Sequence, residues 1–353
     1  MKKHNFSAGP CILPQEVLQK SAEAVLNFNG LNLSLIEISH RSKEFIEVME
    51  NARSLVKELL NLPEGYSVLF LQGGASLEFL MTSYNLLKVG GKSAYLDTGA
   101  WAAKALKEAK LLGDVDVIAS SKDKTYNYIP KNYSISTDVD YVHVTSNNTI
   151  YGTQFKEFPK TDALLVCDMS SDIFSRELDF SQFDLIYAGA QKNMGPAGTT
   201  LVIVKDDILG KTGRTIPAML DYQKHIGADS MFNTPPVFSV YVSMLTLQWL
   251  KGLGGVAAIE KINEAKAALL YDEIDRNPLF KGFAEKEDRS LMNVTFNLTN
   301  EADKDAFDKI WNAAGISGIK GHRSVGGYRA SIYNAMPIES IQVLVDAMQQ
   351  LEK

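Results

Sequence analysis

The chain has 353 residues, of which 45% are hydrophobic and 22% charged, so it can bury a core and is long enough for two domains. Its formal net charge is -6, and its lysines and arginines are spread along the chain. This argues against a nucleic acid or a membrane surface as partner, because both are normally bound by clustered basic residues. Small anionic ligands are still possible, since they need only about two or three basic residues.

The two cysteines, Cys11 and Cys167, lie far apart and belong to no metal-ligand spacing, so we expect neither a disulfide nor a metal site. No apolar stretch of signal-peptide length follows the basic first residues. No window approaches the roughly 18 apolar residues that a membrane span needs. We therefore expect a cytoplasmic protein.

Helical and strand-like segments alternate through the first part of the chain. Residues 43–62 place apolar side chains at helical spacing behind Ser42, a suitable N-cap. Further helices are predicted over Ser76–Leu87 and Ala100–Leu112, and strands at Tyr66–Leu71, Ser93–Asp97, Val115–Ala119, Tyr141–Thr145, Ala163–Asp168, Asp184–Tyr187 and Thr200–Val204. These strands are rich in Val, Ile and Leu without clean alternation, which is typical of a mostly parallel sheet between helices.

The pattern changes at a Gly-rich break over residues 252–255. Beyond it we predict a long helix at Val256–Arg276, a strand at Leu291–Leu298, a helix at Glu301–Ala314, a β-rich stretch near Tyr328–Tyr333 and a last helix from Ile338. We therefore predict a large α/β domain over residues 16–252 and a smaller C-terminal α+β domain over 253–353, which the N-terminal segment 1–15 joins.

A lysine and an aspartate follow two of the buried strands. Lys192 comes shortly after the strand at Asp184–Tyr187, and Asp168 ends the strand at Ala163–Asp168. Alone, either could belong to an ordinary turn. Neighbouring parallel strands, however, would bring both to the carboxyl edge of the sheet, where open α/β sheets bind ligands. A buried amine beside a carboxylate is what pyridoxal phosphate needs, since the amine binds its aldehyde and the carboxylate its ring nitrogen.

Gly73 and Gly74 form a turn between a strand and a helix, where backbone N–H groups can bind an anion. The turn fits neither the dinucleotide fingerprint nor the P-loop pattern, which lowers the odds of a nicotinamide enzyme or an NTPase. Trp101 begins the next helix near the same edge of the sheet, where an indole could stack on a cofactor ring or simply pack in the core.

Eight motifs then occur in order: Asn5–Pro10, Ser39–Lys43, Gln72–Ser76, Ala188–Asn193, Gly195–Gly198, Asn233–Pro236, Gly321–Arg323 and Arg329–Ala335. Together they resemble the phosphoserine aminotransferases, class-V enzymes of the fold-type I pyridoxal-phosphate transferases. The resemblance covers nearly the whole chain, and the ordered set is far more specific than any one motif.

The resemblance implies roles for individual residues. Lys192 would bind pyridoxal phosphate covalently, and Asp168 would bind the nitrogen of its ring. Further cofactor contacts would come from Ala75, Ser76, Trp101, Thr149 and Gln191, and from Asn233 and Thr234 of a second subunit, which implies a homodimer with shared active sites. Arg41 and Arg329 would bind substrate carboxylates, and His322 and Arg323, with Arg41, the substrate phosphate; bidentate arginines suit both tasks.

By the same resemblance, the enzyme would transfer the amino group of L-glutamate to 3-phosphooxypyruvate, giving O-phospho-L-serine and 2-oxoglutarate in serine biosynthesis. A related substrate would be the 4-phosphooxy-L-threonine of pyridoxine biosynthesis. Two positions depart from some relatives, because Ser76 stands in place of an arginine and Tyr151 in place of an acidic residue.

The nearest alternative is another fold-type I enzyme, such as an alanine–glyoxylate aminotransferase or a cysteine desulfurase. A desulfurase needs a reactive cysteine on a mobile loop, which neither Cys11 nor Cys167 provides. A non-catalytic binding protein on the same fold would be expected to have lost Lys192 or Asp168, and this chain retains both.

Overall fold

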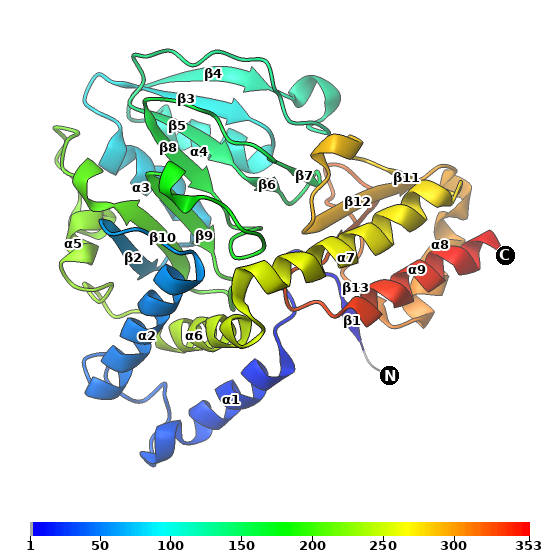
Figure 1. The fold of residues 1–353 in the computed structure, drawn as a ribbon, viewed down its shortest axis with the longest axis horizontal. Coiled ribbons are helices and arrows are strands. Elements are labelled where there is room, and N and C mark those ends of the chain that lie inside the picture. The colour runs from blue at the N-terminus through cyan, green and yellow to red at the C-terminus, as the bar shows by residue number, and fades with distance from the viewer. Residues whose placement is uncertain (1–2) are drawn as a thin grey trace.

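The computed structural model describes residues 3–353 and is built around a seven-stranded sheet (Figure 1). The strand order is β2-β10-β9-β8-β5-β3-β4. The strands are β2 (Tyr66–Leu71), β3 (Lys92–Asp97), β4 (Asp114–Ser120), β5 (Tyr141–Thr145), β8 (Leu164–Asp168), β9 (Leu185–Gly189) and β10 (Thr200–Lys205). Only β10 runs antiparallel to its neighbours, β2 and β9, so the mostly parallel sheet is confirmed.

Helices cover both faces of this sheet. One face packs against α1 (Gln15–Leu26), α2 (Lys43–Leu59) and α6 (Val237–Gly252), and the other against α3 (Gly74–Leu86), α4 (Ala100–Ala109) and the short α5 (Tyr222–Ile226). In β2, Val68 and Phe70 belong to the first core, whereas Leu69 and Leu71 belong to the second. Because every position of β2 is buried on one side or the other, this strand needs no polar alternation.

The ends of several helices differ from the prediction. The predicted helix over residues 43–62 does begin behind Ser42, whose side chain accepts the N–H of Phe45 at 3.4 Å. It ends at Leu59, because Asn61 adopts the left-handed conformation with φ 47°. Residues 301–303 form a 3-10 turn, so α8 begins only at Lys304.

A second, smaller core lies beyond α6. It joins the antiparallel sheet of β11 (Phe280–Gly282), β12 (Asn293–Leu298) and β14 (Tyr328–Ser331) to the helices α7 (Gly255–Arg276), α8 (Lys304–Ala313) and α9 (Ile338–Glu352). The N-terminal strand β1 (His4–Asn5) pairs in parallel with β13 (Ile316–Ser317), beside this core (Figure 1). We propose the domain boundary at the short break between α6 and α7.

A two-stranded hairpin of β6 (Asn147–Asn148) and β7 (Thr153–Gln154) completes the sheets. Within residues 3–353, no single helix is long and apolar enough to cross a bilayer, and α6 with α7 reaches that length only as a pair bent by 83°.

Candidate active site

Asp168 and Lys192 lie at the carboxyl edge of two adjacent parallel strands. Asp168 is the last residue of β8, where it pairs with Tyr187 of β9, and Lys192 follows the end of β9 at Gly189. The two side chains attract each other, which raises the pKa of the lysine and lowers that of the aspartate, though burial acts more strongly on both. The structure thus brings the predicted amine and carboxylate together.

The Lys192 side chain is half-buried and points toward a small polar and aromatic group. Its Nζ donates to Oγ1 of Thr149 at 2.8 Å and lies 5.8 Å from the centre of the Trp101 ring. Burial, helped by the nearby positive charge of Arg329, lowers the pKa of Lys192 to about 8. The lowered pKa makes the unprotonated amine, the form that attacks an aldehyde, easier to reach near neutral pH than for an exposed lysine.

Asp168 is a carboxylate that is almost fully buried. Its side chain is buried, and Oδ1 accepts the N–H of Ser170 at 2.9 Å. Burial raises the pKa of Asp168 above its ordinary value, while Lys192 and Ser170 oppose the rise. A buried carboxylate of this kind gains from a cationic hydrogen-bond partner, such as a protonated ring nitrogen.

The turn between β2 and α3 has the geometry of an anion site. Gly73 and Gly74 take positive φ angles of 92° and 66°, which glycine adopts without strain, and a side chain at residue 73 would meet Leu77 at 2.5 Å. Ala75 and Ser76 lie in the first turn of α3. The N–H groups of a first turn have no partner within their helix, so they can bind a phosphate together with the helix dipole.

Trp101 lies in the first turn of α4. It packs against the cluster of Tyr126, Ile150 and Tyr151, and Nζ of Lys104 lies 4.2 Å from the centre of its ring. Its indole Nε1 is buried and has no hydrogen-bond partner within residues 3–353. A buried donor without an acceptor destabilises the fold, so a bound group that accepts this hydrogen bond would remove the cost.

These groups fit pyridoxal phosphate. An amine of lowered pKa, a buried carboxylate, a helix N-terminus and an indole with an unpartnered donor stand at one edge of the sheet. They match, in that order, the aldehyde, the ring nitrogen, the phosphate and the ring of the cofactor. Gln191, beside Lys192, is half-buried, and its main-chain carbonyl accepts the N–H of Cys11 at 3.0 Å.

Residues beyond α8 and Lys104 of α4 supply positive charge to the same place. Arg329 on β14 donates from Nη1 to the carbonyl of Thr149 at 3.3 Å, and its Nε is buried without a partner in the described chain. Burial lowers the pKa of His322, and the charges of Arg329, Arg323 and Lys104 lower it further. Three cations thus surround this imidazole, an arrangement that attracts a doubly charged anion.

Three predicted residues have no hydrogen bond or ion pair with Lys192 within residues 3–353. Arg41 is exposed just before α2, and no contact within residues 3–353 joins it to the other predicted groups. Asn233 and Thr234 lie in the loop before α6, where Gln72 donates to the carbonyl of Thr234 at 2.6 Å. A single chain therefore brings together only part of the predicted set.

Sequence reasoning missed several residues that shape the site. Cys11 donates from Sγ to the carbonyl of Lys192, and Ser170 holds Asp168. Asn193 accepts the main-chain N–H of Asn334 at 2.9 Å, across 141 residues. Both asparagines belong to the motifs that resemble the family, but nothing in the sequence indicated that they form a hydrogen bond with each other.

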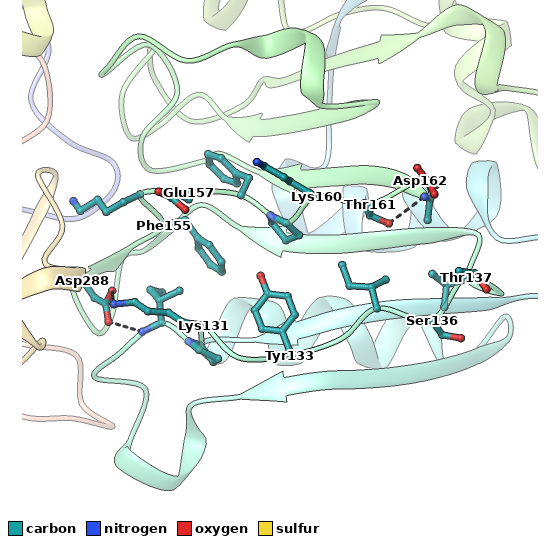
Figure 2. A pocket seen from close by; sticks show the side chains of 18 of the residues that line it. Lys131, Tyr133, Ser136, Thr137, Phe155, Glu157, Lys160, Thr161, Asp162 and Asp288 are labelled. Atoms are coloured by element: carbon teal, nitrogen blue, oxygen red, sulfur yellow. Dashed lines mark hydrogen bonds and ion pairs between the residues drawn. The ribbon is translucent and has the colours of Figure 1, made fainter.

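A separate cavity lies elsewhere, among the loops of the large sheet. It measures about 1070 Å³ and runs between residues 129–139 and 155–163, where Tyr133 and Phe155 point into it (Figure 2). Lys131 and Asp288 stand at one end. None of the predicted site residues lines it, so it is separate from the edge of the sheet that carries Lys192.

Comparisons with known proteins agree with one another. The aminotransferase class-V family matches residues 3–344. The phosphoserine aminotransferase of Flavobacterium psychrophilum is 71% identical over 353 residues, 100% of this chain and 99% of that protein. A phosphoserine aminotransferase solved to study radiation damage of its Schiff base is 50% identical with a TM-score of 0.96, covering 100% of this chain and 99% of that one.

A second solved structure, the phosphoserine aminotransferase from Bacillus circulans subsp. alkalophilus, is 44% identical. It covers 99% of this chain and 98% of its own, with a TM-score of 0.96. Agreement over the full length of both chains means that the large sheet and the smaller C-terminal part match together.

Proposed function

The chain belongs to the class-V aminotransferases and, among them, to the phosphoserine aminotransferases, and on that premise we propose that it converts 3-phosphooxypyruvate to O-phospho-L-serine. L-Glutamate gives the amino group and leaves as 2-oxoglutarate, a transamination of serine biosynthesis. The observation that carries this proposal is the meeting of Lys192, Asp168 and Arg329 at one edge of the sheet, beside the cations around His322.

Pyridoxal phosphate is the cofactor of these enzymes. When bound, it supplies an electron-poor ring that accepts the electron pair left at the substrate α-carbon. Asp168 would hold its ring nitrogen, the first turn of α3 at Ala75 and Ser76 its phosphate, and Trp101 its ring face. Thr149 and Gln191 would flank Lys192 and complete the cofactor contacts of this chain.

Lys192 has two tasks. Its Nζ would hold the cofactor through the aldehyde group, and as a free amine it would accept the proton of the substrate α-carbon. The lowered pKa of Lys192 suits this second task, because a base with a pKa near the working pH gains and loses a proton readily.

Arg329 would bind the substrate carboxylate, and His322 and Arg323, together with Arg41, its phosphate. The guanidinium of Arg329 is largely buried, so its hydrogen bonds to a carboxylate would be strong. A second phosphorylated substrate, 4-phosphooxy-L-threonine of pyridoxine biosynthesis, would use the same cations. We place the enzyme in the cytoplasm, where this metabolism occurs.

A comparison of amino donors tests the substrate assignment. We expect the parent enzyme, assayed in the reverse direction, to use O-phospho-L-serine as amino donor far better than L-alanine. Only phosphoserine carries a phosphate that can bind the cations around His322. Arg323→Ala should raise the KM for phosphoserine by about tenfold, the value of one charge-assisted hydrogen bond, and leave slow turnover of alanine unchanged. If alanine were the better donor, the chain would instead work as an alanine–glyoxylate aminotransferase.

We further propose a homodimer with shared active sites. Arg41, Asn233 and Thr234 bear the family motifs, yet no hydrogen bond or ion pair within residues 3–353 joins them to Lys192. Apolar side chains next to these motifs are exposed, with Ile36 at 58% and Phe232 at 40%, and a partner subunit would cover them. In this proposal the loop of one subunit reaches the cofactor phosphate of the other.

Subunit mixing tests this arrangement. Lys192→Ala and the double variant Asn233→Ala, Thr234→Ala should each be nearly inactive as homodimers. When equal amounts are unfolded and refolded together, half of the dimers are mixed and each has one intact site, so activity should return to roughly a quarter of the parent value.

Refolding each variant alone is the control for the mixing experiment. An activity of the mixture no greater than the mean of the two separately refolded variants would show that each site is built from one chain only.

A further inference from the structure

Lys266 is a fully buried lysine that the proposed chemistry does not use. It lies on α7 with 0% of its surface exposed, and its Nζ donates to the main-chain carbonyls of Ile332 at 2.9 Å and Tyr333 at 2.8 Å. No carboxylate within residues 3–353 forms an ion pair with it. Burial alone lowers the pKa of Lys266 to about 7.

Stability is a poor reason for this arrangement. A buried amine without an anionic partner is expensive, and an apolar side chain of similar volume would normally stabilise the fold more. The position of the two carbonyls that Lys266 binds suggests that it orders the nearby main chain. They lie immediately after β14, at the point where the strand that carries Arg329 leaves the sheet.

The next residue connects this segment to Lys192. The N–H of Asn334 donates to Oδ1 of Asn193, the neighbour of Lys192, at 2.9 Å. Its Nδ2 donates to the carbonyl of Phe174 at 2.8 Å, and its Oδ1 accepts Nδ2 of Asn263 at 2.9 Å.

Asn263 and Lys266 lie one turn apart on α7. Together their side chains form hydrogen bonds with the consecutive residues 332–334. Asn263 also donates to the carbonyl of Ser175 at 3.0 Å. The hydrogen bonds thus join α7, the segment after β14 and the loop of Lys192 into one buried network.

We propose that Lys266 is a positioning residue, which fixes Arg329 at its working distance from Lys192 by binding the carbonyls of Ile332 and Tyr333. The network leaves the segment 332–334 no freedom to shift along α7, so the guanidinium and the amine keep one relative placement. Displacement by a fraction of an ångström is enough to weaken substrate alignment. The inference rests on the proposed role of Arg329 in carboxylate binding.

Lys266→Met tests the inference, because methionine keeps much of the length and apolar character of the side chain and removes both hydrogen bonds. We expect the KM for L-glutamate and the inhibition constant of maleate, a dicarboxylate without an amino group, to rise by about tenfold. The visible absorbance of the bound cofactor should stay unchanged, and kcat should fall by no more than about threefold. Lys261→Met, on the exposed side of the same helix, is the matched control.

Thermal unfolding separates a positioning task from a purely structural one. If Lys266→Met changed the melting temperature but left the glutamate KM and maleate inhibition within about twofold of the parent, the inference would be wrong. Should Lys266→Met not fold, Asn263→Ala removes the adjacent bond to Asn334, and unchanged dicarboxylate binding in that variant would equally overturn it.

Arg329→Ala distinguishes failure of the inference from failure of the proposed function. A large loss of maleate inhibition in Arg329→Ala, with none in Lys266→Met, would contradict only the task of Lys266. No loss in Arg329→Ala would contradict the role of Arg329 itself.

Discussion

Lys192→Ala should lose transaminase activity by at least about a thousandfold, because it removes both the covalent attachment of the cofactor and the base that moves the α-carbon proton. The purified variant should also lack the absorbance at about 400 nm that a lysine-bound cofactor gives. Both effects follow from one amine, so they should appear together. A visible spectrum of the purified protein and an assay with glutamate measure them.

Lys205→Ala is the matched control for that experiment. Lys205 ends β10 and pairs with Asp184 at 2.9 Å, at the opposite edge of the sheet from Lys192. This surface change should leave spectrum and turnover close to the parent. If Lys192→Ala kept a normal visible band, another lysine would hold the cofactor and the site would have to be placed elsewhere.

Asp168→Asn should reduce kcat by roughly a hundredfold to ten-thousandfold, although the side chain hardly changes shape. The amide can still accept the N–H of Ser170, so local structure should survive. What disappears is the negative charge that keeps the ring nitrogen protonated, and with it the capacity of the ring to accept electrons. Cofactor affinity, measured by titration of the apoenzyme, should fall as well.

The comparison residue for Asp168 is Asp184, which precedes β9 and lies away from the site. Asp184→Asn should bind the cofactor normally, though it loses the ion pair with Lys205. A kcat of Asp168→Asn within about threefold of the parent would mean that this carboxylate does not serve the ring nitrogen.

The central sheet could be read from the sequence because its strands are short apolar runs. The same patterns placed Asp168 and Lys192 after neighbouring strands, and the rule that ligands bind at the carboxyl edge then linked them. Helix α6 was missed for the opposite reason. It is buried on most sides, so it has no polar face and no helical period to reveal it.

Contacts between distant segments could not be predicted. Asn193 and Asn334 meet across 141 residues, and Lys266 binds carbonyls 66 and 67 positions away. No local pattern encodes such pairs, since they depend on how segments far apart in the sequence pack against one another. Arg41 shows another limit, because its motif was recognised but one chain does not bring it to Lys192.

The N-terminal segment has a consequence for how the protein is made. The carbonyl of Ala8 accepts the hydroxyl of Tyr333 at 2.7 Å, so this segment closes onto a residue that is synthesised 325 positions later. A ribosome-bound chain can complete its large sheet early, since domains generally fold as they emerge. The contact that holds the N-terminal segment in place can form only after Tyr333 has emerged from the ribosome.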